Sequence, residues 1–324
     1  MFAFTLILIT ACLSAGILLH FMIPQLRKVG ITGKDMNKPD QPEVAEMGGL
    51  AIAAGFSAGM LVAIALETFS KALSTNVDLI SLLAAFVTVL AISIIGIADD
   101  LLSIPQRLKA LAPIAAALPL VAIKAGDTNL LIPFFGQLNI GLLYPLFLVP
   151  FGLTGAANAV NMLAGFNGLE TGMGAIAVGA LAIIAYKLGA TTSLILLIAA
   201  LGAIVATLYF NWYPARIFVG DVGTLSIGTI IATAVILGNC ELAGVILIIP
   251  YGLDFLLKAK NRFPSAGWWG IYQDEKLHCP EHGPVGLAQL VMKLTGGLSE
   301  RQLVLTLMGV EALAGLIAIL LFAR

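Results

Sequence analysis

The feature that most constrains this chain is a series of apolar blocks, each about 20 residues long, separated by short polar segments. A helix needs about 20 apolar residues to cross about 30 Å of hydrocarbon. Only 11% of the residues are charged, whereas a soluble domain carries about 25%. Backbone polar groups inside a bilayer must be hydrogen-bonded within the protein, so these blocks are expected to be helices. The sequence therefore predicts an all-α polytopic membrane protein.

Breaks at proline, glycine and charged residues divide the apolar sequence into ten predicted transmembrane spans. They cover residues 2–23, 49–67, 79–97, 109–123, 141–158, 173–188, 191–210, 224–239, 241–258 and 302–323. No internal repeat or soluble domain separates them, so residues 1–324 are expected to form a single integral membrane domain. The N-terminus has no basic region and no small-residue cleavage site, which favours a retained first span over a signal peptide.

The 17 lysines and arginines are distributed unevenly among the segments between spans, which we number loop 1 to loop 9. Thirteen lie in or beside odd-numbered loops, three lie in or beside even-numbered loops, and one is the C-terminal residue. Positive residues stay on the cytosolic side, so odd loops are expected to be cytosolic and both termini outside. The odd loops are residues 24–48, 98–108, 159–172, 211–223 and 259–301.

Three further features limit the range of folds and partners. A net charge of −1 argues against a nucleic-acid partner, which requires a basic surface. Three widely separated cysteines imply no disulfide framework. In one even loop, residues 129–141, two short apolar runs around Gly136-Gln137 favour a small external β-hairpin, with a loose hydrophobic loop as the alternative.

Adjacent carboxylates, Asp99 and Asp100, stand at the cytosolic end of the third span. Two such groups at a membrane boundary are costly unless a cation compensates them. Successive side chains on a helix point about 100° apart, so we expect one carboxylate near a metal and the other near a nucleophile. Lys109, at the start of the next span, could neutralise them or bind a phosphate. The alternative is a solvated helix end with ordinary flanking charges.

Loop 5 and the end of the span before it carry three carboxamides, Asn158, Asn161 and Asn167, followed by Glu170. Asn158 and Asn161 are three residues apart and are expected to share one helix face. Carboxamide oxygens suit a hard cation such as Mg²⁺, and the scarcity of Cys/His clusters disfavours zinc. Asn167-Gly168 is typical of a turn that could present backbone groups to a nucleotide base. The alternative is that these amides hold helices together.

Two further odd loops carry candidate binding residues. In loop 7, Asp221 is flanked by glycine just before the eighth span and is a candidate metal ligand, while Phe218 could stack on a ring; an ordinary turn with interfacial aromatics is the alternative. In loop 9, prolines break the helix that would align His278 with His282, which favours phosphate or sugar contact over metal ligation.

Two other features of the region have simpler preferred interpretations. Trp268-Trp269 favours an interfacial aromatic belt over sugar stacking. Asp254, four residues before Lys258, favours an ion pair within one helix.

In order along the chain, these segments resemble the polyprenyl-phosphate N-acetylhexosamine-1-phosphate transferase superfamily. Within it they are most similar to the UDP-N-acetylglucosamine–dolichyl-phosphate N-acetylglucosaminephosphotransferase branch and its archaeal relatives. The matching segments are Asp35-Met-Asn-Lys38, Ala45-Glu46, Asp99-Asp100 with Lys109, Asn158 to Glu170, Phe218-Val-Gly-Asp221 and Glu300-Arg-Gln-Leu303. Bacterial cell-wall members carry Asp-Gly-x-Asp-Gly in loop 5, where this chain has Ala164 and Asn167 in place of both aspartates. A bacterial-type undecaprenyl-phosphate sugar-1-phosphate transferase is the alternative.

The resemblance implies transfer of N-acetylglucosamine-1-phosphate from a UDP-sugar to dolichyl or other polyprenyl phosphate, with release of UMP. This would be the first membrane step of lipid-linked glycan synthesis for N-glycosylation. It implies Mg²⁺, with Mn²⁺ as a substitute, as the cofactor. Asn161 and Asp221 would be its ligands. Catalytic roles beside the phosphates are implied for Asp99, Asp100 and Lys109. Substrate contacts are implied for Glu46 and for three residues around the uracil, namely Met36, Asn167 and Phe218.

Two departures from the family pattern affect the site. Ser103 stands where an Asp or Asn is common, and the Arg-His-Arg stretch that clasps pyrophosphate and sugar in eukaryotic members is absent. Candidates to replace that stretch are Arg262, Lys276, His278 and His282.

The resemblance also implies a cytosolic active site, at the plasma membrane in a prokaryote and at the endoplasmic reticulum in eukaryotic relatives. The sequence leaves open whether the chain forms a homodimer. A secondary transporter is the rival interpretation, and it would place charged residues and broken helices near the middle of the bilayer.

Overall fold

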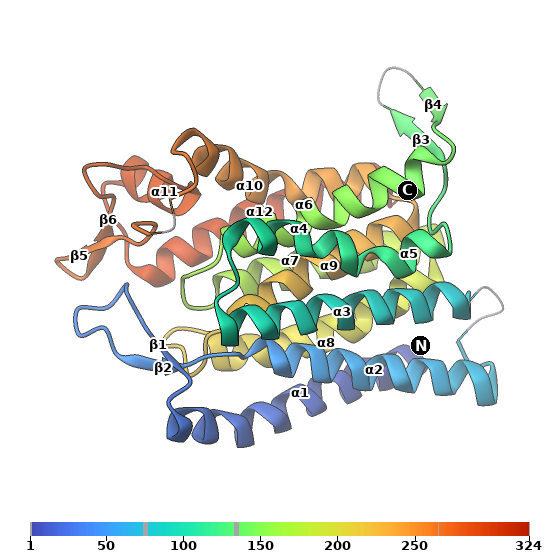
Figure 1. Ribbon diagram of the computed structural model, residues 1–324, viewed down its shortest axis with the longest axis horizontal. Helices are drawn as coiled ribbons and strands as arrows, with labels where there is room; N and C mark the ends of the chain where they lie inside the picture. The colour runs from blue at the N-terminus through green and yellow to red at the C-terminus, as the bar shows by residue number, and fades with distance from the viewer. Residues whose placement is uncertain (1, 74–76, 133–135, 265, 324) are drawn as a thin grey trace.

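Long helices dominate the computed structural model, which describes residues 2–73, 77–132, 136–264 and 266–323. Eight helices of this described part are long and apolar enough to cross a membrane. They pack side by side in one bundle (Figure 1), which is the predicted polytopic helical architecture. Their ranges are α1 (Phe2–Val29), α2 (Gly49–Ser70), α3 (Leu79–Leu102), α7 (Leu169–Leu188), α8 (Thr191–Asn211), α9 (Gly220–Gly238), α10 (Glu241–Lys260) and α12 (Glu300–Phe322).

The fourth and fifth predicted spans are helical but interrupted. In place of the fourth, α4 (Gln106–Ala116) and α5 (Leu118–Ala122) meet at Ala117. In place of the fifth, one π-helical turn, η1 (Tyr144–Leu148), leads into α6 (Val149–Met162). Prolines lie inside α4 and near the start of the other three segments. Because proline lacks an N–H and crowds the preceding turn, it breaks the regular helix at these points.

In the described part of the chain, three antiparallel hairpins project from the bundle. They are β1 (Thr32–Lys34) with β2 (Glu43–Ala45), β3 (Asn129–Ile132) with β4 (Gly136–Asn139), and β5 (Ile271–Gln273) with β6 (Lys276–His278). The β3–β4 hairpin confirms the predicted one, except that Gly136 and Gln137 lie in a strand and not in the turn. The Asn139 amide donates to the Asn129 side-chain oxygen at 2.8 Å, and this cross-strand bond fixes the register. The sequence did not predict the other two hairpins or α11 (Leu287–Thr295).

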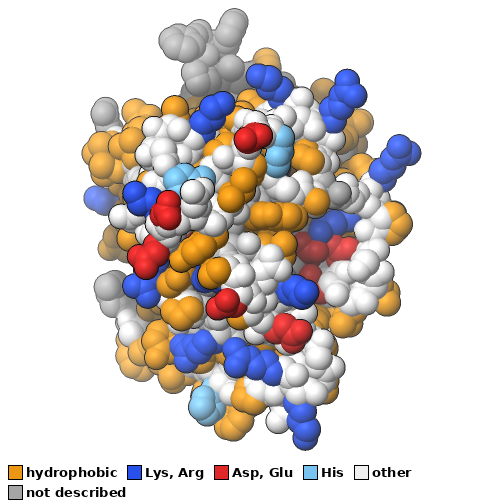
Figure 2. Space-filling model, turned by 90° about the vertical axis from the view of Figure 1, so that its left-hand side faces the viewer, with side chains coloured by type: hydrophobic (Ala, Val, Ile, Leu, Met, Phe, Trp, Pro, Cys, Tyr) orange, Lys and Arg blue, Asp and Glu red, His pale blue; other side chains and the backbone are white. Residues whose placement is uncertain are grey.

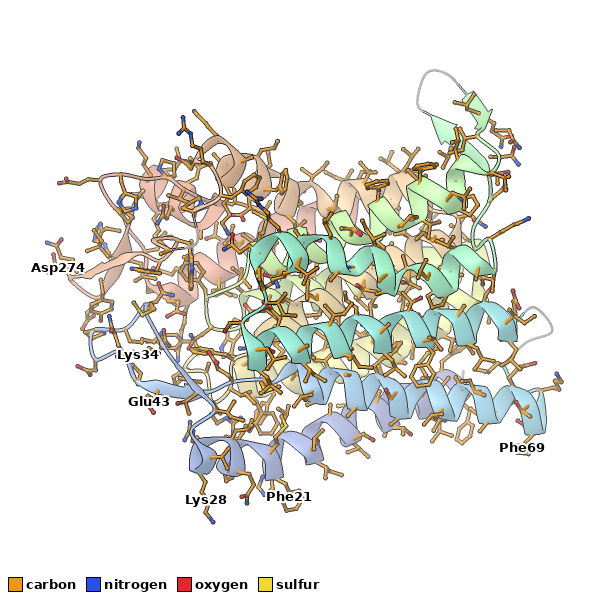
Figure 3. The ribbon with its side chains drawn as sticks, viewed as in Figure 1. Phe21, Lys28, Lys34, Glu43, Phe69 and Asp274 are labelled. Carbon is orange, nitrogen blue, oxygen red and sulfur yellow. The ribbon has the colours of Figure 1, made fainter. Side chains whose placement is uncertain are left out.

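The two ends of the bundle differ in character. Hairpins β1–β2 and β5–β6 and helix α11 gather at one end, which we call the loop end, whereas the β3–β4 hairpin and both termini lie at the other (Figure 1). Lys28, Lys34, Glu43 and Asp274 lie at the loop end, and Phe69 lies at the opposite end (Figure 3). Figure 2 faces the loop end and shows basic and acidic side chains spread across it. The odd loops that carry the predicted site residues therefore share one face.

Close helix contacts at the loop end depend on glycine. A Cβ added at Gly96 in α3 would lie 2.3 Å from the Val222 Cα in the first turn of α9. One added at Gly49, the first residue of α2, would lie 2.1 Å from the backbone nitrogen of Gly223. Small residues let transmembrane helices approach this closely. The last turn of α3 and the first turns of α2 and α9 consequently meet, which brings Asp99 and Asp100 beside Asp221.

Candidate active site

Asp99 and Asp100 have different partners, as expected from their directions on α3. Asp100 accepts hydrogen bonds from the backbone N–H groups of Asp221, at 2.7 Å, and Val222, at 3.2 Å. These N–H groups belong to the first turn of α9, where the helix leaves donors unpaired and favours negative charge. The chain can approach this closely because Gly220 has φ +69° and a Cβ there would lie 2.5 Å from the Asp100 Oδ2. Asp100 therefore caps α9.

Lys109 joins two carboxylates from different helices. Its ammonium lies 2.6 Å from the Asp99 Oδ2 and 2.6 Å from the Asp221 Oδ2. The other Asp99 oxygen accepts from the Ile104 backbone N–H at 2.9 Å. Asp99 is buried and Lys109 is partly buried, so each charge is weakly screened by solvent and attracts the other more strongly than on an open surface. The sequence suggested that Lys109 could neutralise Asp99 and Asp100; in the structure it pairs with Asp99, but with Asp221 in place of Asp100.

Asn161 lies beside the same carboxylate cluster, at the end of α6. Its Nδ2 donates to the Asp221 Oδ1 at 2.6 Å. Asn158, three residues earlier, instead donates to the backbone oxygens of Ala110 in α4, at 3.0 Å, and Thr154, at 2.9 Å. The two amides lie three residues apart on α6, as expected, but they bond different partners because α4 lies close to Asn158. Asn158 holds helices together, and Asn161 belongs to the site.

Loop 1 and loop 7 lie against each other beside the cluster. The Phe218 N–H donates to the Ala45 carbonyl at 2.7 Å, and the Gly48 N–H donates to the Phe218 carbonyl at 2.8 Å. This brings Glu46, between Ala45 and Gly48, into the same region as partly buried Phe218. Burial, followed by the negative charge of Asp221, raises the pKa of Glu46 above its ordinary value. Glu46 consequently lies within electrostatic reach of Asp221.

Asn167 is the centre of a second group of contacts. Its side-chain oxygen accepts from the Ala215 N–H at 2.7 Å, its amide nitrogen donates to Asp35 at 3.0 Å, and its backbone N–H donates to Glu300 at 2.8 Å. With only 2% of its surface exposed, Asn167 already has partners for these three groups. Met36, the residue after Asp35, is partly buried in the same loop. In the sequence, Asp35 and Glu300 are only parts of longer motifs, and their spacing along the chain does not indicate that both bond Asn167.

Loop 9 packs on loop 5 and loop 1. A Cβ added at Gly165, where φ is +123°, would lie 2.3 Å from the Trp268 ring, and Trp268 also makes an edge contact with Phe166. Neither sequence-based interpretation of Trp268 included this contact with loop 5. The predicted ion pair of Lys258 with Asp254 is confirmed at 3.0 Å.

The cationic candidates of loop 9 differ in their surroundings. The His278 ring packs against Gly297, whereas Arg262, Lys276 and His282 are exposed. Within the described residues no ion pair is formed by these four side chains. The three exposed cations are thus available to a substrate.

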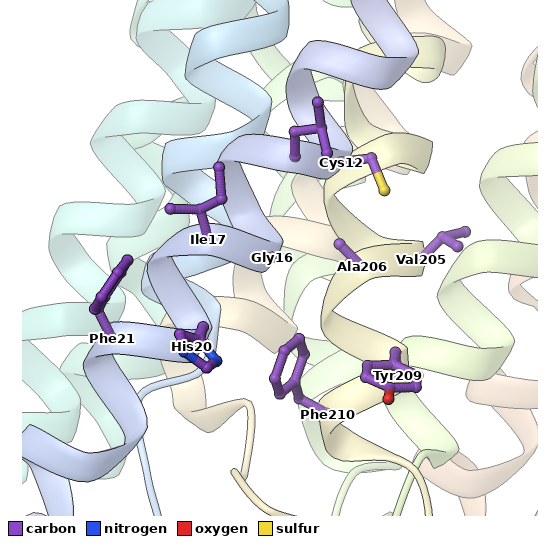
Figure 4. Close-up of a pocket in the computed structure, with 10 residues that line it drawn as sticks. Cys12, Gly16, Ile17, His20, Phe21, Val205, Ala206, Tyr209 and Phe210 are labelled. Atoms are coloured by element: carbon purple, nitrogen blue, oxygen red, sulfur yellow. The ribbon is translucent and has the colours of Figure 1, made fainter.

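A groove of about 550 Å³ lies elsewhere, on the outer surface between α1 and α8. It is almost entirely apolar (Figure 4). Its lining residues are Cys12, Leu13, Gly16, Ile17, His20, Phe21, Val205, Ala206, Tyr209 and Phe210. None of the predicted site residues lines it.

The donor atoms near Asp221 suit a hard divalent cation. No group of three or more His, Cys, Asp or Glu side chains in the described part of the chain is arranged to hold a metal. However, Asp221, Asp99 and Asn161 together offer carboxylate and carboxamide oxygens, the donors that Mg²⁺ prefers. Ligation by Asn161 would require its amide to turn its oxygen, rather than Nδ2, towards the ion. In donor type, these residues fit the expected cofactor.

Fold and site define a polytopic helical membrane protein with clustered carboxylates, a lysine and a carboxamide at one end of the bundle. Residues 82–239, which include this cluster, match glycosyl transferase family 4. A Saccharolobus solfataricus protein provisionally named UDP-N-acetylglucosamine–dolichyl-phosphate N-acetylglucosaminephosphotransferase is 39% identical, over 93% of this chain and 91% of its own. The Dictyostelium discoideum protein of that name is 27% identical, over 89% of this chain and 82% of its own. A Clostridium perfringens phospho-N-acetylmuramoyl-pentapeptide-transferase is 36% identical, over 50% of this chain and 54% of its own. The chain belongs to glycosyl transferase family 4, which confirms the resemblance and the predicted class of enzyme.

Proposed function

We propose that this enzyme transfers N-acetylglucosamine-1-phosphate, or a similar hexosamine-1-phosphate, from a UDP-sugar to dolichyl or other polyprenyl phosphate. The observation that carries the proposal is the cluster of Asp99, Lys109, Asp221 and Asn161 at the loop end of a membrane bundle. The printed names of the S. solfataricus and D. discoideum relatives support this pair of substrates. The half-length match to the C. perfringens enzyme keeps a bacterial-type acceptor as the alternative.

In the proposed reaction, an oxygen of the lipid phosphate attacks the sugar-linked phosphorus of the UDP-sugar. The bond from that phosphorus to the bridging oxygen breaks, and UMP leaves with the electron pair. The second pKa of a phosphate monoester is about 6, so the attacking oxygen needs no strong base at neutral pH. Asp99 would therefore orient the acceptor more than deprotonate it, while Lys109 offsets the negative charge that gathers there.

Mg²⁺, or Mn²⁺ in its place, would supply further neutralisation of charge on the diphosphate and the departing UMP. Asn161 and Asp221 are the proposed ligands, because their side chains already meet at 2.6 Å beside Lys109. Glu46, within electrostatic reach of Asp221, would line the same site. Met36, Phe218 and the backbone around Asn167 are proposed to frame the uracil.

We also propose ten transmembrane spans, with the interrupted segments α4–α5 and η1–α6 as the two additional to the eight long helices. The loop end would face the cytosol and both termini the outside, because thirteen of the 17 basic residues lie in or beside the odd loops. In a prokaryote the membrane would be the plasma membrane.

The rival function, secondary transport, predicts charged groups in the middle of the bundle. Asp99, Lys109 and Asp221 lie at the loop end, which favours the enzyme. Glu311 is an exception to the scarcity of charge in mid-span: it is fully buried near the middle of α12, and neither carboxyl oxygen has a hydrogen-bond partner. Among the residues that the structure describes, no ion pair joins Glu311 to a cation, and one buried carboxyl does not make a transport pathway.

The test is release of UMP by purified protein supplied with UDP-N-acetylglucosamine, dolichyl phosphate and Mg²⁺. We expect UMP and lipid-linked N-acetylglucosamine in equal amounts, and none when either substrate is omitted. Asp99→Asn should reduce the rate on the order of 10²-fold or more, because it removes the negative charge that holds Lys109 beside the acceptor phosphate. Absence of UMP release from a panel of UDP-sugars and polyprenyl phosphates would contradict the proposal.

A further inference from the structure

An ion pair connects the first loop to the last helix of the chain. The Lys38 ammonium donates to the Glu300 carboxylate, and lies 3.1 Å from the Asp35 Oδ2. It also lies 4.4 Å from the centre of the Tyr213 ring in loop 7, within the range of a cation–π interaction. Lys38 therefore connects loop 1 to two segments that are distant in sequence.

The two carboxylates that hold Lys38 also hold Asn167. Asp35 accepts from the Asn167 side chain at 3.0 Å, and Glu300 accepts from its backbone N–H at 2.8 Å. Asn167 in turn accepts from the Ala215 N–H of loop 7 at 2.7 Å. Loop 1, loop 5, loop 7 and α12 are thereby joined in one network.

The network is almost completely removed from solvent. The exposed fraction is 4% for Asp35, 2% for Asn167 and 5% for Glu300. A buried carboxylate without a compensating cation is strongly unfavourable, and Lys38 supplies that cation for both Asp35 and Glu300. Removing the Lys38 charge would leave two neighbouring carboxylates to repel each other, so the loops would separate.

Asn37 extends the network to loop 9. Its Nδ2 donates to the Gly165 carbonyl of loop 5 at 3.1 Å, and its oxygen accepts from the Gly270 N–H of loop 9 at 3.3 Å. Loops 5, 7 and 9 are consequently connected to loop 1 through three of its residues, Asp35, Asn37 and Lys38. When a loop becomes ordered only as a ligand binds, the entropy cost of that ordering weakens ligand binding. A loop that is already held in place avoids this cost.

We infer that Lys38 and Glu300 are positioning residues that hold loops 1, 5 and 7 in the conformation that binds the nucleotide half of the UDP-sugar. This inference rests on the proposed function, which places Met36, Asn167 and Phe218 around the base. Lys38 lies two residues after Met36, and Glu300 bonds Asn167 directly. The pair acts through these loops and does not touch the reacting atoms.

The test compares Lys38→Met, Glu300→Gln and the double variant by steady-state kinetics with UDP-N-acetylglucosamine and dolichyl phosphate. Glu300→Gln keeps an oxygen for the Asn167 N–H and removes only the charge. We expect each single variant to raise KM for the UDP-sugar about tenfold, with KM for the lipid phosphate within about twofold of wild type. The double variant should resemble either single one, because residues of one network are not additive.

Two further variants separate positioning from general damage. Lys38→Arg restores the charge and should bring KM for the UDP-sugar back to within about threefold of wild type. Lys71→Met is the control: it breaks the ion pair between Lys71, the residue that follows α2, and Glu67 in the last turn of that helix. It should leave both KM values unchanged. If Lys38→Met does not fold, Glu300→Gln and Lys38→Arg still carry the comparison.

Calorimetry of UDP binding to the same variants gives a readout that does not need turnover. Weaker UDP binding by Lys38→Met and Glu300→Gln supports the inference. Wild-type KM and UDP affinity in these variants, additive losses in the double variant, or an equal rise in KM for both substrates would overturn it. Failure of the wild type to release UMP contradicts the proposed function instead, and UDP calorimetry then decides the inference separately.

Discussion

Single residues at the loop end balance charge in two different ways. Lys109 compensates Asp99 and Asp221 with a side-chain ammonium, whereas Asp100 is compensated by the backbone N–H groups that begin α9. A side chain can move when substrate arrives, but the start of a buried helix cannot. We therefore interpret Asp100 as the fixed part of the site. Asp99, Asp221 and Lys109 are the part that can exchange partners with a phosphate or a cation.

The assignment of Asn161 and Asp221 as Mg²⁺ ligands can be tested with Asn158 as a matched control. We expect Asn161→Ala and Asp221→Ala to lower turnover on the order of 10²-fold and to raise the Mg²⁺ concentration required, because each removes an oxygen donor from a divalent ion. Asn158→Ala is the control: the residue lies on the same helix, but it bonds the backbone of Ala110 and Thr154. It should keep the wild-type Mg²⁺ dependence. The measurement is UMP release as a function of Mg²⁺ concentration, after removal of bound metal with a chelator. Near wild-type rates at saturating Mg²⁺ in either Asn161→Ala or Asp221→Ala would show that the ligands are elsewhere.

At the scale of helices and strands, the sequence predicted what hydropathy determines. The eight long helices follow from apolar length, and the β3–β4 hairpin follows from two short apolar runs. The strands of β1–β2 and β5–β6 are only three residues long, too short for a visible period, and they form because the chain on either side is held by other loops. Spacing placed Asn158 and Asn161 on one helix face, but it could not show that Asn158 bonds the backbone of α4 while Asn161 bonds Asp221. Contacts such as Lys38 with Glu300 join residues 262 positions apart, and no local pattern can predict them.

Loop 9 is the element whose role the sequence left most open. Arg262, Lys276 and His282 are exposed, so their contribution depends on whether they contact the substrate. We expect Arg262→Ala to raise KM for the UDP-sugar roughly tenfold, and His282→Ala to raise it less, because a hydrogen bond to a charged group contributes about 1.5–3 kcal/mol before solvent screening. KM for the lipid phosphate should change less in both.

The alternative is that the cations of loop 9 contact only anionic lipid headgroups and not the substrate. The Arg27→Ala variant distinguishes these two possibilities. Arg27 is an exposed arginine at the end of α1, where the same headgroups would be reached. Kinetics in detergent without anionic lipid should show the effect for Arg262→Ala and not for Arg27→Ala. Unchanged KM and kcat for both loop 9 variants in that detergent would assign the sugar contacts to another part of the site.

At the scale of the whole molecule, the residues of the candidate active site lie at one end of the bundle and not at the other. The cluster around Asp221, the network around Lys38 and most basic residues share the loop end, and the β3–β4 hairpin and both termini share the other (Figure 1). A UDP-sugar is a charged cytosolic metabolite, and a lipid phosphate presents its head at the membrane surface. An active site at one end of the bundle can meet both substrates without a passage through the membrane.

This arrangement predicts on which side of the membrane each end lies. Ser103 is exposed at the end of α3, beside Asp99, and Gln137 is exposed in β4 at the opposite end. In a variant whose three cysteines, Cys12, Cys240 and Cys279, are replaced, Ser103→Cys and Gln137→Cys provide matched probes. An impermeant maleimide applied to intact cells should modify Gln137→Cys and not Ser103→Cys, and inside-out vesicles should show the reverse. The basic residues in and beside the odd loops give the reason, because positive side chains remain on the cytosolic side during insertion. Activity measured on the same preparations controls for correct folding. Labelling of Ser103→Cys from outside in an active enzyme would invert the topology and place the carboxylate cluster away from the cytosolic supply of UDP-sugar.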